Sequence, residues 1–322
     1  MRLLLLFSVF LLLGVHSFAQ IFYVHPEGKG NGMSWDEAAS DLALILAQTE
    51  AGDEIWVAAG TYTATRSGDR NISFVIPNGV SVFGGFSGQE TMRKQRDWSK
   101  NPTILSGEIG APGEDDNTFN VVYTENVGPA TRLDGFIIMG GNANGQVPKG
   151  GRIRGGGGWH DMAANGGKSR PHISNCTFLA NKALEGGAFY CNGEDGSSSP
   201  IFSNCRFQGN FANVDGGAIF SNGRSESTSQ VKLFNCIFQD NMASYGAGIF
   251  FDNGFNETGL TVENCIFKKN NAFLWGGGIY YSYPVGGDFD FQMHECHFES
   301  NYPTDVNKES FLSESDRGLA KK

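Results

Sequence analysis

The second half of the chain repeats one order of apolar, polar and glycine positions about every 30 residues. The segment Ser174–Tyr190 (SNCTFLANKALEGGAFY) returns in altered form from Ser203, Asn235 and Asn264, and a shortened copy begins at Glu295. A period that holds over successive copies is typical of stacked structural units, in which each copy buries its apolar face against its neighbours.

Three columns of identical residues run through these copies. They are the cysteines Cys176, Cys205, Cys236, Cys265 and Cys296, the phenylalanines Phe178, Phe207, Phe238, Phe267 and Phe298, and the asparagines Asn181, Asn210, Asn241, Asn270 and Asn301. Cysteine and phenylalanine lie two residues apart, so they share one face of a strand, and we expect both columns inside. Asparagine tolerates left-handed backbone angles, and stacked asparagines can join their amides in a chain, so we expect that column at the bends.

A glycine tract follows each of the first four asparagines, at Gly186, Gly216, Gly246 and Gly276. Glycine allows a turn or a close approach of two chains. A helical repeat of the same length is the alternative architecture, but glycine tracts and recurrent asparagines would break a helix in every copy. The pattern therefore predicts an all-β fold, a parallel β-helix with one coil per copy.

Before residue 150 the pattern is less regular. Short apolar segments separated by Gly, Pro or Asn predict further strands from Glu54 onward. One helix is predicted near 35–48, where Ser34 and Glu37 form a capping box and an apolar stripe begins at Leu42. We expect this helix to cover the N-terminal end of the stack, because an open end would expose unpaired strand edges.

The first 19 residues have the pattern of a secretory signal peptide. Arg2 precedes an apolar run from Leu3 to Leu13, and small residues stand at Ser17 and Ala19, the positions that a signal peptidase reads. The run is too short for a comfortable membrane span, and no later segment is apolar enough for one. We therefore expect export to the periplasm, the cell surface or the extracellular space.

The remaining chain is predicted to form one domain. This β-helix domain spans 20–303, with regular 30-residue coils from about 150, and a polar tail follows at 304–322. The formal net charge is −10, with no basic stripe, so nucleic acid is not an expected partner.

The repeats resemble a known family. The motifs FLAN, FQGN, FQDN, FKKN and FESN, paired with GGAF, GGAI and GGGI, are similar to the repeats of chlamydial polymorphic outer membrane proteins. The front segments SWDEAASDLALILAQTEAGDEIWVAAGTY and GGFSGQETMRKQRDWSKNPTILSG resemble the opening of secreted bacterial right-handed β-helix repeat proteins, whose fold is similar to that of pectate lyases. The resemblance implies a right-handed coil of about nine or ten turns.

The cysteine column suggests either free thiols or disulfides. Equivalent atoms on stacked coils lie about 4.8 Å apart, which is wider than the Cβ separation of roughly 3.8 Å that a disulfide prefers. A column of five cannot pair completely, so we expect a buried ladder of free thiols. A disulfide involving Cys191, which is off the column, is the alternative. Zinc is not expected, because the chain has no Cys-x-x-Cys pair.

The stretch 149–172 interrupts the regular coils and gathers basic residues in an acidic protein. A polysaccharide lyase needs a cation that neutralises a uronate carboxylate and a base that removes the neighbouring proton. This stretch supplies both residue types, and a solvated basic loop is the alternative interpretation. The candidate catalytic residues are Arg152, Arg154, His160, Lys168 and Arg170.

Two further groups of residues are candidates for binding. Asp115 and Asp116 lie in an acidic segment that could hold calcium, with a solvated turn as the alternative. Aromatic residues follow the glycine tracts and could form either an exposed sugar-stacking stripe or an inward ladder. These are Trp159, Tyr190, Phe220, Phe250 and Tyr280.

The strongly repeated residues all have a structural explanation, and no catalytic set is complete. We therefore expect a non-enzymatic scaffold, exported from the cell, whose elongated face serves adhesion or binds an extracellular polysaccharide or a host or cell-surface glycan. A polysaccharide lyase that uses the stretch 149–172 is the alternative. Calcium is the one cofactor considered, and the oligomeric state stays open.

Overall fold

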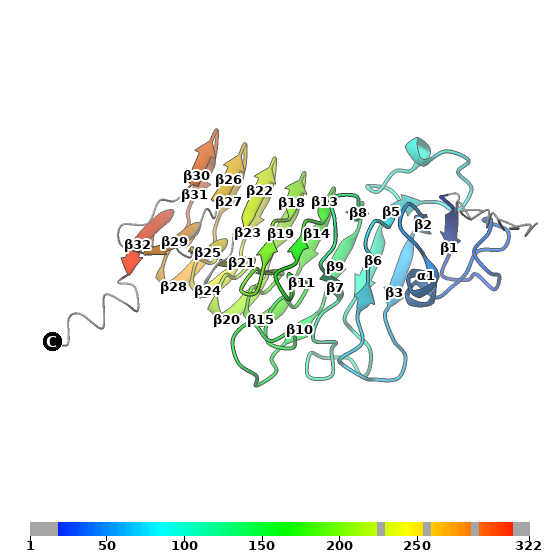
Figure 1. Ribbon diagram of the computed structural model, residues 1–322, viewed down its shortest axis with the longest axis horizontal. Coiled ribbons are helices and arrows are strands. Elements are labelled where there is room, and N and C mark those ends of the chain that lie inside the picture. The colour runs from blue at the N-terminus through cyan, green and yellow to red at the C-terminus, as the bar shows by residue number, and fades with distance from the viewer. Residues whose placement is uncertain (1–18, 224–228, 254–258, 285–289, 312–322) are drawn as a thin grey trace, which may run out of the picture.

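The chain folds into an all-β solenoid of about nine turns with one short α-helix (Figure 1). The structure is a computed structural model and describes residues 19–223, 229–253, 259–284 and 290–311. The predicted signal peptide therefore lies almost entirely outside the described residues. Successive turns stack along the long axis, from the N-terminal turns on the right of Figure 1 to the C-terminal turns on the left.

In the part of the chain that the structure describes, five sheets of parallel strands make up the wall of the solenoid. Sheet I contains β1 (Ile21–Val24), β2 (Glu54–Ala58), β5 (Ser81–Phe86), β8 (Arg132–Asp134), β13 (His172–Ser174), β18 (Ile201–Ser203), β22 (Gln230–Phe234), β26 (Gly259–Glu263) and β30 (Asp290–His294). Sheet II contains β3 (Gly60–Thr63), β6 (Thr103–Ser106), β9 (Ile137–Met139), β14 (Thr177–Leu179), β19 (Arg206–Gln208), β23 (Ile237–Gln239), β27 (Ile266–Lys268) and β31 (His297–Glu299).

The other three sheets close each turn. Sheet III contains β4 (Phe74–Val75), β7 (Val122–Glu125), β11 (Trp159–Met162), β16 (Phe189–Asn192), β21 (Ile219–Gly223), β25 (Ile249–Asn253), β29 (Ile279–Pro284) and β32 (Val306–Phe311). Sheet IV contains β10 (Asn142–Ala143), β15 (Lys182–Glu185), β20 (Phe211–Asp215), β24 (Met242–Tyr245) and β28 (Asn271–Trp275), and sheet V contains β12 (Lys168–Ser169) and β17 (Ser197–Ser198).

Left-handed residues turn the chain from one sheet to the next. The residue before each ladder cysteine has positive φ, as in Asn175 (52°) and Asn235 (54°), so Cys and Phe can face the interior together after the bend. At the second bend the positive φ belongs to the residue before the ladder asparagine, such as Asp240 (55°). The ladder asparagine stabilises that bend through its side chain instead.

The glycine tract is required by close packing of neighbouring coils. Gly216 has a φ of +67°, and a Cβ on Gly217 would lie 2.5 Å from the carbonyl oxygen of Ala247 on the next coil. Any larger residue would push the two coils apart, which explains why the tract recurs once per turn.

The interior holds the cysteine and phenylalanine columns. Cys176, Cys205, Cys236 and Cys265 are buried, Cys296 at the C-terminal end is half-buried, and all six cysteines of the chain are free thiols. Consecutive phenylalanine rings of the column stack 4.6–4.9 Å apart and nearly parallel. Together with the aliphatic residues of sheets I and III they form one continuous core.

The helix α1 (Leu42–Gln48) is shorter than the predicted range 35–48. The proposed start at Ser34 was wrong, because Ala39 pairs with strand β1 and holds the preceding segment extended. Asp41 caps the helix instead, accepting a hydrogen bond from the backbone N–H of Leu44. The apolar stripe of this helix, Leu42, Ile45 and Leu46, is buried in the core of the first turns, beside β4.

A second correction concerns the C-terminal segment. Residues 304–322 were predicted to be a polar tail, but Val306–Phe311 form β32 and pair with β29 in sheet III. The exposed edge of β29 offers backbone donors and acceptors to any following chain, so the segment extends the sheet despite its polar sequence. Residues 312–322 lie outside the described residues.

Candidate functional site: a basic loop and a cationic groove

The predicted basic stretch divides between two parts of the surface. Residues 144–155, called the basic loop below, lie against the outer face of sheets III and IV. Lys168 and Arg170 lie beyond strand β11, at a groove beside sheets I and V. The five candidate catalytic residues therefore do not form one site.

The cations of the basic loop bind to the protein itself. The guanidinium of Arg154 donates three hydrogen bonds of 2.7–3.1 Å to the carboxylate of Glu185, which is 1% exposed. Arg152 lies 4.0 Å from the ring centre of Tyr123 and donates a hydrogen bond of 2.8 Å to the hydroxyl of Ser73. Both arginines are held in internal contacts, so neither is presented to a substrate.

His160 is fully buried on the outer face of strand β11. Its ring stacks on Tyr190 at 5.1 Å and lies 6.1 Å from Tyr123, and its Nδ1 lies 3.0 Å from the carbonyl oxygen of Gly155. Burial lowers the pKa of His160 to about 4, and the nearby positive charge of Arg152 acts in the same direction. The side chain is therefore neutral near pH 7 and serves as part of an aromatic stack.

This stack corrects the predicted aromatic column. Strand register places His160, and not Trp159, beside Tyr190, because Trp159 pairs with Phe189 in the interior. The buried outer column continues from Tyr190 through Phe220, Phe250 and Tyr280 as a separate apolar cluster. Consecutive rings of this aromatic ladder stack 4.9–5.2 Å apart. The ladder is neither an exposed stripe nor part of the main core.

One acidic residue of the same stretch is not among the candidate catalytic residues. Asp161 is fully buried inside the solenoid and accepts hydrogen bonds of 2.5–2.7 Å from the hydroxyls of Thr124, Ser169 and Ser198. Burial raises its pKa, and the three hydroxyl donors oppose that effect. The hydroxyl donors come from three separate strands, so no local sequence signal identifies this network.

Lys168 and Arg170 line a surface groove of about 310 Å³ beside sheets I and V, away from the basic loop. Lys232 is the third cation of the groove. It lies two coils further along the stack, since His172 pairs with Ile201 on the next coil and Ile201 pairs with Lys232 on the coil after that. The remaining lining residues are polar or apolar and include no acid: Pro129, Ser197, Ser199, Ile201 and Gln230. Among the ion pairs that the structure describes, none involves these three cations.

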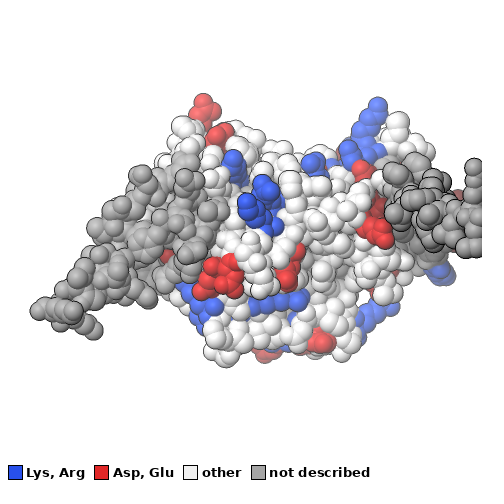
Figure 2. Space-filling model, viewed as in Figure 1, with Lys and Arg blue, Asp and Glu red and all other residues white. Residues whose placement is uncertain are grey.

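Charged side chains are scattered over the face of the molecule drawn in Figure 2. On the face drawn in Figure 2, basic and acidic side chains lie in small separate groups among large uncharged areas. Among the described residues this groove holds three cations that form no ion pair and is lined by no carboxylate, and it is hereafter called the cationic groove. Its size reaches the range of roughly 300–1,000 Å³ typical of ligand sites.

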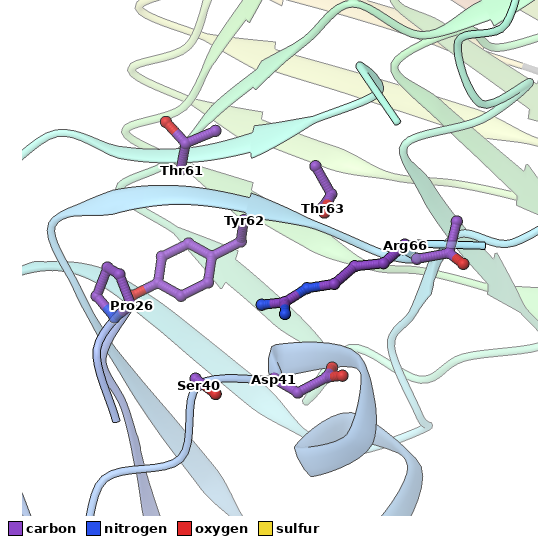
Figure 3. A pocket seen from close by; sticks show the side chains of 8 residues that line it. Pro26, Ser40, Asp41, Thr61, Tyr62, Thr63 and Arg66 are labelled. Carbon is purple, nitrogen blue, oxygen red and sulfur yellow. The ribbon is translucent and has the colours of Figure 1, made fainter. Parts of the chain in front are cut away.

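A smaller hollow lies beside the helix α1. It measures about 90 Å³, and Figure 3 shows the Arg66 side chain extending between the Tyr62 ring and Asp41. The Tyr62 hydroxyl donates a hydrogen bond to the carbonyl oxygen of Ala58, and burial raises its pKa. This hollow is well below the size of roughly 300 Å³ at which ligand pockets begin.

The calcium candidates lie in a surface loop before β7. Asp116 accepts a hydrogen bond of 2.7 Å from the backbone N–H of Ala111, and Asp115 is exposed. Within the described residues, no three His, Cys, Asp or Glu side chains are grouped so as to hold a metal ion. The same residues include no helix long and apolar enough to cross a membrane.

Comparisons with known proteins bear on the fold. The family model described as "right handed beta helix region" matches residues 160–284. The chain is a right-handed β-helix. Among curated proteins no sequence matches it significantly.

Three solved structures are similar to this right-handed β-helix. A rhamnogalacturonan lyase is 13% identical with a TM-score of 0.37, over 84% of this chain and 75% of its own. The pectate lyase Pel9A is 13% identical with a TM-score of 0.45, over 92% and 78%. The pectin methylesterase PemA from Erwinia chrysanthemi is 11% identical with a TM-score of 0.45, over 94% and 95%. At these values the similarities assign no activity to this chain.

Proposed function

We propose that this protein is an exported β-helical scaffold that binds acidic polysaccharide in the cationic groove. The single observation that carries the proposal is that Lys168, Arg170 and Lys232 line one groove without an acidic partner among the described residues. Export rests on the N-terminal sequence, and a surface role is supported by the resemblance of the repeats to polymorphic outer membrane proteins.

The groove has the chemistry that a chain of uronate sugars requires. Lysine and arginine side chains form charge-assisted hydrogen bonds with carboxylates. Ser199 and Gln230 offer hydrogen-bonding groups for sugar hydroxyls, and Ile201 offers an apolar surface. Lys168 and Arg170 come from one coil and Lys232 from the second coil after it, so the set extends along the stacking direction, along which an extended polymer can lie.

The basic loop supports a scaffold more than a lyase. Its arginines are bound to Glu185, Ser73 and Tyr123, and the ring of His160 is fully buried. A base for β-elimination must reach the substrate proton. Arg152 and Arg154 thus hold the loop against the wall, while the candidates Lys168 and Arg170 lie apart from them in the cationic groove.

Binding of polygalacturonate, measured by calorimetry with the full chain at low salt, tests the proposal. The double variant Lys168→Ala/Lys232→Ala should weaken binding roughly tenfold, because each exposed charge pair contributes up to about 1 kcal/mol. Added salt should weaken binding by the wild-type protein, because it screens exposed charges.

The double variant Lys29→Ala/Lys94→Ala is the matched control, since it removes the same net charge from exposed positions outside the groove. Equal loss of affinity in both double variants, or no binding by the wild type, would refute the proposal. Formation of unsaturated sugar products from polygalacturonate would instead identify a lyase.

A further inference from the structure

The ammonium group of Lys149 lies in a site built from an aromatic ring and two carboxylates. Its Nζ is 4.5 Å from the centre of the Phe220 ring, 3.6 Å from Oδ2 of Asp215 and 3.8 Å from Oδ2 of Asp252. An aromatic face combined with negative charge is a common way for proteins to bind alkylammonium groups.

The walls of this site belong to the rigid stack. Phe220 lies between the rings of Tyr190 and Phe250 in the aromatic ladder, at 5.0 and 5.2 Å. Asp215 ends strand β20, and Asp252 lies in strand β25 and is fully buried. Because strand pairing fixes these side chains from neighbouring coils, the site does not depend on Lys149 for its shape.

Lys149 comes from the basic loop, between Pro148 and two glycines, and its side chain is 35% exposed. Gly150 has a φ of +87°, which few other residues tolerate. The loop is anchored separately by Arg154, which contacts Glu185 at 2.7 Å. Lys149 can therefore leave its site without detaching the rest of the loop.

The contacts that Lys149 makes with carboxylates are also longer than those of Arg154 in the same loop. Both of its carboxylate distances exceed the range of about 2.7–3.2 Å for a hydrogen bond, whereas all three bonds from Arg154 to Glu185 fall within it. A side chain that serves only to neutralise buried acids would be expected to fit as closely as Arg154 does.

We propose that Phe220, Asp215 and Asp252 form a binding site for primary ammonium groups, which Lys149 fills until an external ammonium displaces it. The ligand class is a primary alkylammonium, as carried by polyamines and by amino sugars. This site carries negative charge, whereas the cationic groove carries positive charge, and the proposal does not depend on the function proposed above.

Chemical rescue of Lys149→Ala by n-propylammonium tests the site, because that ion resembles the part of the side chain that is removed. Propylammonium chloride should raise the melting temperature of Lys149→Ala more than sodium chloride of equal ionic strength does. It should have less effect on the wild type, whose site is filled. If Lys149→Ala does not fold, Lys149→Met, which keeps the apolar stem, replaces it.

Lys182→Ala is the matched control, because it removes a lysine that pairs with the exposed Glu114 and leaves the basic loop and Lys149 unchanged. Rescue of both variants to the same extent, or of neither, would overturn the proposal. Asp252→Asn added to Lys149→Ala should abolish the rescue. Titration of the wild type with spermidine and with glucosamine oligomers then distinguishes the two sources of ammonium, and binding of neither contradicts displacement of Lys149.

The rescue should also depend on pH. Burial raises the pKa of Asp215 to about 6, Lys149 lowers it, and Glu185 and Asp252 raise it further. Without Lys149 this pKa lies higher still, so Asp215 is largely uncharged at about pH 5, and propylammonium should rescue Lys149→Ala less there than at about pH 8. Rescue that does not change with pH would exclude Asp215 from the site. The charged and titratable groups around Asp215 are Lys149 and Arg154 of the loop, Glu185 of β15, Asp252 of β25 and Tyr280 of β29.

Discussion

The buried asparagines stabilise the solenoid because each amide serves polar groups on neighbouring coils. Asn241 donates hydrogen bonds to Asn270 Oδ1 at 2.9 Å and to the carbonyl oxygen of Phe207 at 3.0 Å. Its own Oδ1 accepts from the backbone and side-chain N–H groups of Asn210, both at 3.0 Å. A single side chain therefore satisfies groups that no strand pairing reaches.

Replacing Asn241 by alanine should destabilise the protein strongly. The change removes the side-chain acceptor of the buried backbone N–H of Asn210 and takes one hydrogen bond each from the Asn210 side-chain amide and the Phe207 carbonyl, and a buried polar group left without a partner costs about 1–3 kcal/mol. We expect the free energy of unfolding in urea to fall by roughly 3 kcal/mol or more.

The exposed Asn213 on strand β20 supplies the control. Asn213→Ala should change the free energy of unfolding by no more than about 0.5 kcal/mol. Similar losses in both variants would show that the buried amide column has no special role.

At the level of elements, strand β32 protects the edge of sheet III. It pairs with β29 over six residues, from Ile279–Val306 to Pro284–Phe311, and the half-buried Val306 packs against the core. The Tyr280 hydroxyl also contacts the Glu309 carboxylate. These contacts give a polar segment a fixed place in the fold.

A chain that ends after residue 303 should be less stable than one that ends after residue 311. Loss of the β32 ladder removes several backbone hydrogen bonds of roughly 0.5–1.5 kcal/mol each and exposes the edge of β29. We expect a lower urea midpoint and concentration-dependent association in size-exclusion chromatography. Identical behaviour of the two truncated chains would contradict a stabilising role for β32.

Over the whole molecule, two buried groups oppose each other in the dependence of stability on pH. The pKa of His160 is about 4 in the folded protein against about 6.5 when unfolded, so the unfolded chain binds more protons between these values. Its contribution to stability is therefore lost as the pH falls. Asp215, with a pKa of about 6, binds its proton in the folded state first and contributes in the opposite direction.

Replacing His160 should change how the free energy of unfolding depends on pH. Relative to the wild type, His160→Phe should gain roughly 3 kcal/mol in the free energy of unfolding as the pH falls from about 6.5 to about 4. Phenylalanine keeps the stacking position between Tyr123 and Tyr190. Urea unfolding at a series of pH values measures the difference, and parallel curves for the two proteins would show that His160 does not titrate as described.

The repeat columns were sufficient to predict the architecture because each column has a single physical role. A phenylalanine recurs at the position of Phe238 in every copy, because each ring stacks inside the core on the ring of the coil before it. The bounds of individual elements depend instead on strand pairing, as the late start of α1 and the presence of β32 show. Their sequences have no marker for the partner strand that decides the outcome.

The candidate sites depended on register and on distance through space. Residues 149–172 are continuous in sequence, yet strand β11 separates Arg154 from Lys168 and sends them to different surfaces. Lys232 joins the groove from two coils away, and no local motif connects it with Arg170. A shift of one position, from Trp159 to His160, decided which ring joined the aromatic ladder.

The sequence by itself determined the β-helical architecture, the inward columns and the glycine turns, because identical residues at a fixed period must occupy equivalent positions in stacked coils. Only the tertiary structure decided which charges are paired. Whether a lysine faces a carboxylate or an open groove depends on which coils come into contact, and that information is spread over residues far apart in the chain. Lys149 and Lys168 differ for this reason alone.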